Sequence, residues 1–247
     1  KGGRFAQHCA PAQVFSIVLS DIIGDPLDMI ASGPAWPDSS SCAQALAITE
    51  KYQLRLSPDA YACLQRETPK SLSNVTTQIT GSVRQLCSAA AAAAEKLGYE
   101  TQILTDTLNC EAKDAGAWMA SLAREHHGSS KKLAFIAGGE TVVKLTGKGK
   151  GGRNQELALS AAAGIDGMEN VCIFSVGSDG TDGPTDAAGG YVDGATAQKL
   201  RDLGIALFAV LQNNDAYHAL GQVDGLIITG PTGTNVNDVS VLLIDPT

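Results

Sequence analysis

KLTGKGKGGRNQE, residues 144–156, is the stretch that decides the fold. This glycine-rich, cationic loop follows a strand expected at 141–145 and runs into a helix expected at 154–164. Strand, glycine loop and helix in this order favour phosphate binding, because glycines tolerate positive φ and leave backbone N–H groups uncovered, and a helix N-terminus attracts anions. The expected phosphate ligands here are Gly147, Lys148, Gly149, Lys150, Gly151, Gly152 and Asn154.

Arg153 stands at the expected start of this helix and is the candidate catalytic residue. A planar guanidinium there can grip a phosphoryl group through two hydrogen bonds and stabilise the charge on transferred oxygens. Three alternatives stay open: an ion pair of Arg153 with Glu140 or Glu156, a flexible hairpin of solvated lysines, or a dinucleotide loop with GxGxxG spacing.

Outward from the loop, strands and helices are expected to alternate, which predicts an α/β fold with mostly parallel sheets flanked by helices. The apolar run 14–22 predicts a strand buried on both faces. Further strands are expected at 78–81, 99–104, 133–137, 171–176, 226–229 and 239–244, and helices at 41–54, 57–67, 82–97, 111–126 and 195–203. Two domains are expected, 1–70 and 71–247, with the first represented only in part. The chain begins at a lysine within KGGR, which predicts a piece of a longer protein.

Composition narrows the classes of partner. The net charge of -8 and pI near 4.9 argue against nucleic acid or anionic membrane as the main partner. Six scattered cysteines without metal-site spacing predict free thiols, and no apolar run has the roughly 18 residues of a membrane span. We therefore expect a cytoplasmic protein that binds small molecules, with a homodimer as an open alternative.

Three further loops follow expected strands, at the sheet edge where open α/β proteins bind ligands. In VGSDGTDGPTDAAGG, residues 176–190, Asp179 and Asp182 are candidate Mg²⁺ ligands and Asp186 a candidate substrate contact, with Asx-turns or a helix N-cap as the alternative. TGPTGTNVND, residues 229–238, either wraps a phosphate or sugar edge or forms a tight turn between edge strands. Its candidate ligands are Thr232, Gly233, Thr234 and Asn235.

SDIIGDPLDMIASGP, residues 20–34, is the remaining loop. Asp21, Ser32 and Gly33 are its candidate substrate contacts, and Glu140 joins them from the stretch before the glycine loop. The sequence contains no HExxH, GxSxG or CxxC motif, so metalloprotease, nucleophile-elbow hydrolase and dithiol redox chemistry lose their usual support.

Five motifs in this order, SDIIGDPLDMIASGP, IAGGET, GKGGRNQELAL, GSDGTDGPTDAAGG and TGPTGTNVNDV, resemble the class II glycerate kinases, or glycerate 2-kinases, over essentially the whole chain. By this resemblance, residues from about 132 to 247 correspond to the family's C-terminal (MOFRL) domain, and residues 1–70 to the end of its Rossmann-like N-terminal domain. The arginine of GGRNQE, here Arg153, is thought to be catalytic in that family. The other catalytic residue of that family is a lysine in an N-terminal motif that this chain lacks. In addition, Asn214-Asp215-Ala216 stands where the family is expected to have Asn-Asp-Ser.

The resemblance implies ATP-dependent phosphoryl transfer to the 2-hydroxyl of D-glycerate, giving 2-phosphoglycerate and ADP, with Mg²⁺ as the metal. Two alternatives remain: an NAD(P)-dependent hydroxypyruvate reductase, based on the GxGxxG spacing, and an inactive nucleotide-binding fragment.

Overall fold

The computed structural model describes residues 1–246 and divides the chain into two units, Lys1–Thr80 and Gly81–Thr247. The boundary expected near residue 70 falls instead inside the first unit, because residues 75–80 form a strand that pairs with the first strand of the chain. All six cysteines are free, and within residues 1–246 no helix is long and apolar enough to cross a membrane.

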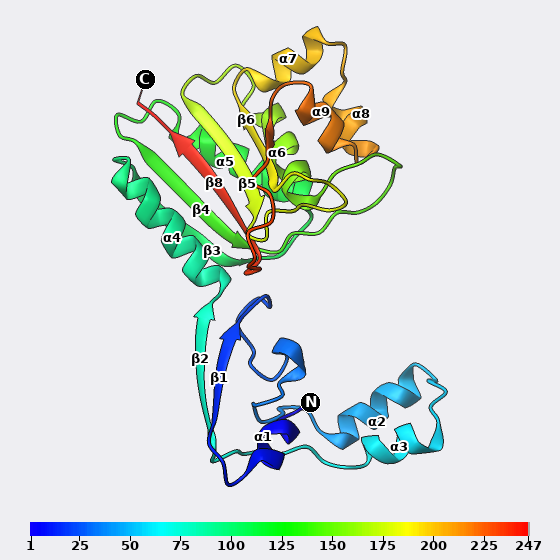
Figure 1. The fold of residues 1–247 in the computed structure, drawn as a ribbon. Coiled ribbons are helices and arrows are strands. Elements are labelled where there is room, and N and C mark those ends of the chain that lie inside the picture. Colours follow the sequence, from blue (N-terminus) through cyan, green and yellow to red (C-terminus); the bar gives the residue numbers. More distant parts are fainter. Residues whose placement is uncertain (247) are drawn as a thin grey trace. The chain divides into compact units, whose positions relative to one another are not determined.

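The first unit is small, and its two strands lie side by side with their arrows pointing the same way (Figure 1). Its elements are α1 (Arg4–Cys9), β1 (Val14–Leu19), the 3₁₀-helix η1 (Ile30–Ser32), α2 (Cys42–Lys51), α3 (Pro58–Leu64) and β2 (Val75–Gly81). α2 and α3 begin one residue after the expected positions 41 and 57. Ser41 and Ser57 are their capping residues, and Pro58 takes the first position of α3.

The expectation that β1 is buried on both faces is wrong within this unit. Alternate residues of β1 are exposed, with 76% of Phe15 and 76% of Ile17 accessible. An apolar run shows that a strand can be covered on both faces, but covering it takes layers that a two-stranded sheet does not supply.

The second unit is built on a six-stranded sheet in the order β3-β4-β8-β5-β6-β7 (Figure 1). Its strands are β3 (Glu100–Leu108), β4 (Leu133–Gly139), β5 (Val171–Gly177), β6 (Gly189–Asp193), β7 (Leu226–Ile227) and β8 (Asp238–Ile244). The α/β class is confirmed, but the expected mostly parallel sheet is wrong here. Among the strands of this sheet in residues 1–246, only β3 and β4 pair in parallel. The last strand, β8, inserts between β4 and β5 and runs antiparallel to both, and β6 runs antiparallel to β5 and β7.

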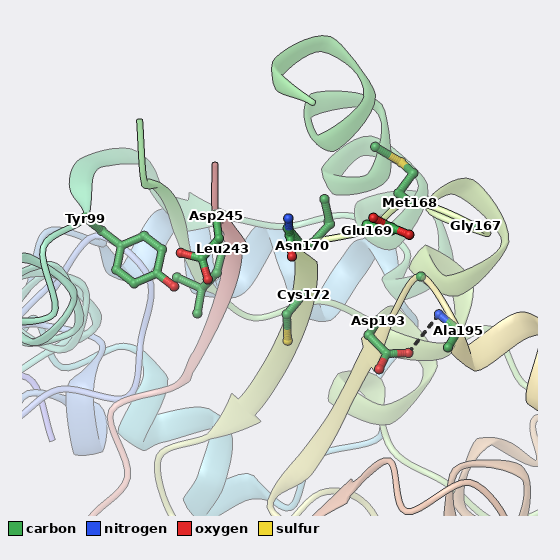
Figure 2. A pocket seen from close by; sticks show the side chains of 12 residues that line it. Tyr99, Gly167, Met168, Glu169, Asn170, Cys172, Asp193, Ala195, Leu243 and Asp245 are labelled. Atoms are coloured by element: carbon green, nitrogen blue, oxygen red, sulfur yellow. Dashed lines mark hydrogen bonds between the residues drawn. The ribbon is translucent and has the colours of Figure 1, made fainter. Parts of the chain in front are cut away.

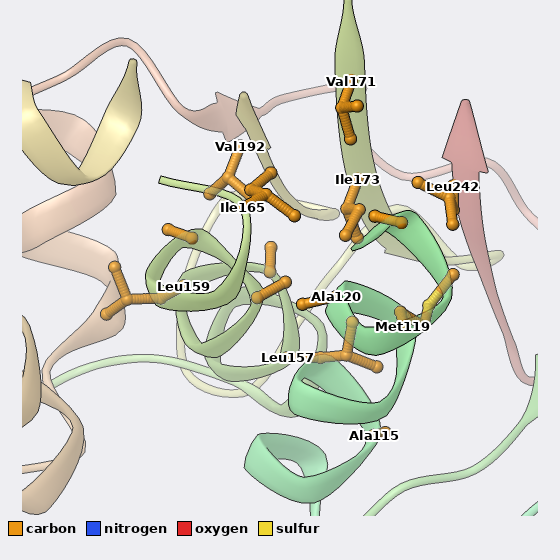
Figure 3. Close-up of a cluster of buried hydrophobic side chains, with 14 of the residues drawn as sticks. Ala115, Met119, Ala120, Leu157, Leu159, Ile165, Val171, Ile173, Val192 and Leu242 are labelled. Atoms are coloured by element: carbon orange, nitrogen blue, oxygen red, sulfur yellow. The ribbon is translucent and has the colours of Figure 1, made fainter. Parts of the chain in front are cut away.

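Helices cover both faces of this sheet. They are α4 (Val83–Lys96), α5 (Ala112–His126), α6 (Arg153–Gly164), α7 (Thr196–Asp202), α8 (Leu207–Gln212) and α9 (Ala216–Gly221). On one face α4 packs on Ile136 and Val241, whereas α5 and α6 pack together on the other, around Met119, Leu157 and Ile173 (Figure 3). Small residues let α5 and α6 approach closely, and a Cβ on Gly116 would overlap the carbonyl of Leu157.

The strand expected at 141–145 is also absent. Val142 forms one isolated bridge to Glu111, and the rest of that stretch has no strand assignment. The chain therefore leaves the sheet at Gly139, which places Glu140 at the edge of the sheet and the glycine loop beyond it.

Candidate functional site

The ends of three central strands, β4, β8 and β5, lie side by side at one end of the six-stranded sheet. Because β8 is antiparallel to its two neighbours, its first residue, Asp238, lies opposite the last residues of β4 and β5, Gly139 and Gly177. This register brings the loops that begin at residues 140, 178 and 229 to the same edge as the N-terminus of α6. Asp21, Ser32 and Gly33 belong instead to the first unit.

The glycine loop is fastened to the segment between α8 and α9, which differs from the expected open phosphate cradle. The backbone N–H groups of Lys148 and Gly149 donate to Asn213, and that of Lys150 donates to Asp215 at 2.9 Å. Those N–H groups are therefore already occupied. None of Gly147, Gly149, Gly151 and Gly152 has a positive φ.

Close approach explains the glycines instead. A Cβ on Gly147 would overlap the backbone of Asn213, and one on Gly149 would overlap both Asn213 and Asp215. A Cβ on Gly152 would overlap Asp182. The glycines are needed where the loop touches its neighbours, so the conformational reason expected from the sequence is wrong.

Asn214 is the central fastening of the loop. Its Oδ1 accepts hydrogen bonds from the backbone N–H groups of Thr146 (2.7 Å) and Gly147 (2.9 Å). Its Nδ2 donates to the carbonyl of Lys144 (3.2 Å) and to Oε2 of Glu156 (3.1 Å). Asn214 is buried and has φ 55°, a left-handed conformation that asparagine tolerates better than most residues.

The N-terminus of α6 is occupied by a carboxylate of the protein itself. Oδ1 of Asp182 accepts from the backbone N–H and the Nδ2 of Asn154, and its Oδ2 accepts from the N–H of Gln155 at 2.9 Å. Burial raises the pKa of Asp182 to about 6, although these hydrogen bonds act in the opposite direction. The helix-cap alternative thus describes Asp182 better than the predicted metal ligand, because both oxygens are already engaged.

Asn154 is also unavailable to a phosphate. It is 1% exposed, and its Oδ1 accepts from the hydroxyl of Ser175 while its Nδ2 donates to Asp182. The predicted phosphate ligand is therefore part of the buried network beneath the helix start.

Arg153 lies where the sequence places it, at the first residue of α6. Its Nε and Nη2 donate to the two carboxylate oxygens of Asp238, at 2.5 and 3.1 Å, and its Nη1 pairs with Glu140 at 3.1 Å. Burial opposes the charge of the guanidinium, but the hydrogen bond and charge of Asp238, together with Glu140, raise its pKa. The ion pair of Arg153 with Glu140, one of the alternatives from the sequence, is present. Asp238 had no predicted role.

A cavity of about 620 Å³ opens beside Arg153. Its lining combines the glycine loop with Glu140, Val142, Glu156 and Asn214. Within residues 1–246 the backbone N–H groups of Gly151 and Gly152 have no hydrogen-bond acceptor, and both glycines line this cavity. Burial also raises the pKa of Glu156, against the hydrogen bond from Asn214 that lowers it. The cavity has the size of a small-molecule site.

The two remaining polar loops of this unit, residues 178–188 and 229–238, are hydrogen-bonded to each other. The N–H of Thr232 donates to the carbonyl of Asp179 at 3.1 Å, and the N–H of Val236 donates to the hydroxyl of Ser178 at 2.8 Å. Oδ1 of Asp179 accepts from the N–H of Thr181, which is an Asx-turn. The predicted ligands of the 229–238 loop, Thr232, Gly233, Thr234 and Asn235, are exposed beside this turn.

Asp186 and Lys150 meet at Tyr217 on α9. The Tyr217 hydroxyl donates to Asp186 at 2.7 Å and lowers the pKa of that carboxyl, while Lys150 Nζ lies 4.3 Å from the centre of the Tyr217 ring. Lys148 is exposed and, in the described part of the chain, has no ion pair.

No group of three or more histidine, cysteine, aspartate or glutamate side chains is placed to hold a metal ion in the described residues. A second cavity, of about 650 Å³, lies at the opposite ends of the strands, where Tyr99, Asn170, Cys172 and Asp193 line it (Figure 2). The residues predicted from the sequence are not part of its lining, and the cavity beside Arg153 is the candidate site.

Sequence reasoning missed two residues that line the cavity, Glu156 and Asn214. It also missed Asp238, the partner of Arg153. Asn214 lies in the pair Asn213-Asn214, and asparagine before a short helix is a signal for a left-handed, loop-fastening residue. No local pattern marks Asp238, since its partner is 85 residues away.

Comparison with known proteins assigns both units. The MOFRL family model matches residues 133–238, and a domain of unknown function (DUF4147) matches residues 1–65. The chain is 51% identical to D-glycerate 2-kinase of Thermotoga maritima over 99% of its own length and 60% of that protein. It is 33% identical to glycerate kinase of Macaca fascicularis over its whole length and 76% of that protein.

The crystal structure of glycerate kinase from Thermotoga maritima superposes with a TM-score of 0.95 at 50% identity, over 99% of this chain and 60% of that one. The chain thus spans about three fifths of the Thermotoga relative. It belongs to the glycerate kinase family.

Proposed function

We propose that this chain takes part in ATP-dependent phosphoryl transfer to the 2-hydroxyl of D-glycerate, giving 2-phosphoglycerate and ADP. The observation that carries the proposal is the guanidinium of Arg153, held rigidly at the rim of the cavity by Asp238 and Glu140. Phosphoryl transfer depends mainly on positioning and on neutralising charge, and a fixed guanidinium supplies both. The names of the relatives support the same reaction.

The phosphate contacts proposed here differ from a helix-terminus cradle. A guanidinium has five N–H groups, and Arg153 uses two of them in hydrogen bonds to Asp238 while its Nη1 forms an ion pair with Glu140, so at least two N–H groups remain for a ligand. Gly151 and Gly152, whose backbone N–H groups have no acceptor in residues 1–246, line the same cavity, and the Lys148 ammonium can reach an incoming anion from solvent. These groups together form a donor set suited to phosphate oxygens.

Of the two predicted metal ligands, only Asp179 fits Mg²⁺. One of its oxygens accepts from Thr181, and the other remains available, whereas both oxygens of Asp182 cap α6. Mg²⁺ commonly uses one or two carboxylates together with substrate phosphates. When bound, it would offset phosphate charge beside a guanidinium that already faces two carboxylates. The 229–238 loop, fastened to Asp179 through Thr232, would border that position.

For D-glycerate, the proposed contacts of the second unit are Glu140 and Asp186. Carboxylates accept from substrate hydroxyls. In the first unit, the backbone N–H groups of the predicted contacts Ser32 and Gly33 already donate to the carbonyls of Met29 and Ile30, and Gly33 is buried.

The GxGxxG alternative loses its physical basis. Dinucleotide loops bind pyrophosphate at the helix N-terminus, but Asp182 fills that position in this protein and would repel the anion. A hydroxypyruvate reductase is therefore the less favoured function.

Arg153→Ala in the native protein tests the proposal. Removing an arginine that stabilises the transferred group lowers kcat by 10³-fold or more in related chemistries. Coupled assay of phosphoglycerate formation should show a fall of that order, with partial activity in Arg153→Lys. Arg201→Ala is the control, because Arg201 also makes a bidentate pair with an aspartate, through Nη1 and Nη2 to Asp166 at the surface. A two- or threefold loss for Arg153→Ala would remove Arg153 from the centre of the mechanism.

A further inference from the structure

We propose that Asp238 is the positioning residue of Arg153, whose carboxylate sets the orientation in which the guanidinium meets the transferring phosphoryl group. This inference rests on the proposed function, since it needs Arg153 to act on the phosphoryl group. Nothing in the sequence motifs separates Asp238 from its neighbours. The assignment comes from the contacts of its two oxygens.

The pairing is bidentate and side-on. Oδ2 of Asp238 accepts from Nε of Arg153 at 2.5 Å, and Oδ1 accepts from Nη2 at 3.1 Å. Two parallel bonds between a planar carboxylate and a planar guanidinium fix the plane of the guanidinium as well as its position. Nη1 forms an ion pair with Glu140, and at least one N–H on each Nη is left for a ligand.

Asp238 is a rigid base for this bond and Glu140 is not. The side chain of Asp238 is 7% exposed, and the residue begins β8, which is hydrogen-bonded to β4 on one side and β5 on the other. The side chain of Glu140 is 47% exposed and follows the end of β4. Groups on central strands hold a geometry more closely than groups on loops. The orientation of Arg153 is therefore set by Asp238.

A purely electrostatic role for Asp238 predicts different behaviour. Two carboxylates face one guanidinium, so neutralising one of them should favour an anionic ligand and lower KM for ATP. Asp238→Asn keeps the shape of the side chain, but its amide NH₂ meets a guanidinium N–H, and one of the two bonds is lost. If orientation is what matters, kcat should fall about 30- to 100-fold, in line with the cost of small misplacements in catalysis, while KM for ATP changes little.

Steady-state kinetics of the native protein carrying Asp238→Asn test this split, with Asp166→Asn as the matched control at the exposed Arg201 pair. A second experiment asks whether Asp238 holds a free guanidinium ion. Millimolar guanidinium chloride, well below denaturing levels, should restore at least tenfold activity to Arg153→Ala but not to Arg153→Ala/Asp238→Asn. Equal rescue of both variants, or a kcat for Asp238→Asn within threefold of the parent, overturns the proposal.

Should Asp238→Asn fail to fold, NMR of the parent protein labelled with ¹⁵N-arginine decides the matter. A clamped Arg153 should show a slowly exchanging Nε–H and separate Nη resonances, and Arg153→Lys assigns them by their disappearance. Rapid exchange and a single averaged Nη signal contradict the clamp. If the parent protein forms no 2-phosphoglycerate, the proposed function itself fails, and if Arg153→Ala retains full activity, the role of Arg153 fails. An inactive Arg153→Ala beside an unimpaired Asp238→Asn overturns only the role of Asp238.

Discussion

Replacing Asn214 should destabilise the protein far more than replacing its neighbour Asn213. Asn214 is buried, and its amide makes five hydrogen bonds that join the glycine loop to α6. Asn213 is exposed, and its side chain accepts one bond, from the N–H of Lys148. The two residues are adjacent and chemically identical, so the comparison isolates what the contacts contribute.

The magnitude follows from these contacts. The bond from the Thr146 hydroxyl is long, at 3.4 Å, and the other four are 3.2 Å or shorter. At about 1 kcal/mol of net stability for each of these four, Asn214→Ala loses about 4 kcal/mol. Its φ of 55° adds about 1 kcal/mol, because alanine is strained in the left-handed region. Asn214→Gly loses the same bonds without that strain and should lie about 1 kcal/mol above Asn214→Ala in stability. Asn213→Ala should cost about 1 kcal/mol or less.

Equilibrium urea unfolding measures these differences if the slope m is the same in all four proteins. Limited proteolysis adds a local readout, since a released glycine loop should be cut near residues 144–151 first in Asn214→Ala. The reasoning would be refuted if Asn214→Ala and Asn213→Ala lost equal stability, or if the loop stayed protected in both.

Three further predictions follow from other contacts. The pKa of Asp182 is raised to about 6 in the folded state, so its contribution to stability is present below pH 4 and is lost as pH rises through 6. The free energy of unfolding should therefore fall by about 3 kcal/mol between pH 4 and pH 7, and Asp182→Asn should abolish that fall. A pH profile that is unchanged in the variant contradicts the assignment. Gly147→Ala should lower the urea midpoint, because its Cβ would overlap the backbone of Asn213; an unchanged midpoint means that the loop moves freely. Burial raises the pKa of Cys87 to about 11, so a thiol reagent at pH 8 should modify the exposed Cys63 well before it, as peptide mapping can check; equal rates would show that the core around Cys87 opens readily.

The sequence allows the local part of this structure to be predicted. The helix starts near Ser57 and Arg153, and strand β5 after the glycine loop helix, follow from capping residues and apolar runs, which act over a few positions. The insertion of β8 between β4 and β5 does not follow, because antiparallel pairing with strands far earlier in the chain leaves no mark on the alternation of elements.

The candidate site, like the fold, could be predicted only in its local part. Arg153 and the converging loops could be located from motifs, but the partners that determine their chemistry lie far along the chain. Asp182 reaches α6 from 28 residues away, and Asn214 reaches the glycine loop from 67 or more. A glycine-rich loop before a helix is compatible with binding phosphate or with close packing, and only the tertiary contacts distinguish the two. Here the packing partner occupies most of the donors.

The most direct test of the central claim is ³¹P NMR of the native protein incubated with D-glycerate, ATP and Mg²⁺. The account predicts a resonance of 2-phosphoglycerate that grows as ATP is consumed and that is absent with Arg153→Ala. Formation of 3-phosphoglycerate instead, product formation that does not depend on Arg153, or ATP left intact while hydroxypyruvate is reduced by NAD(P)H would contradict it.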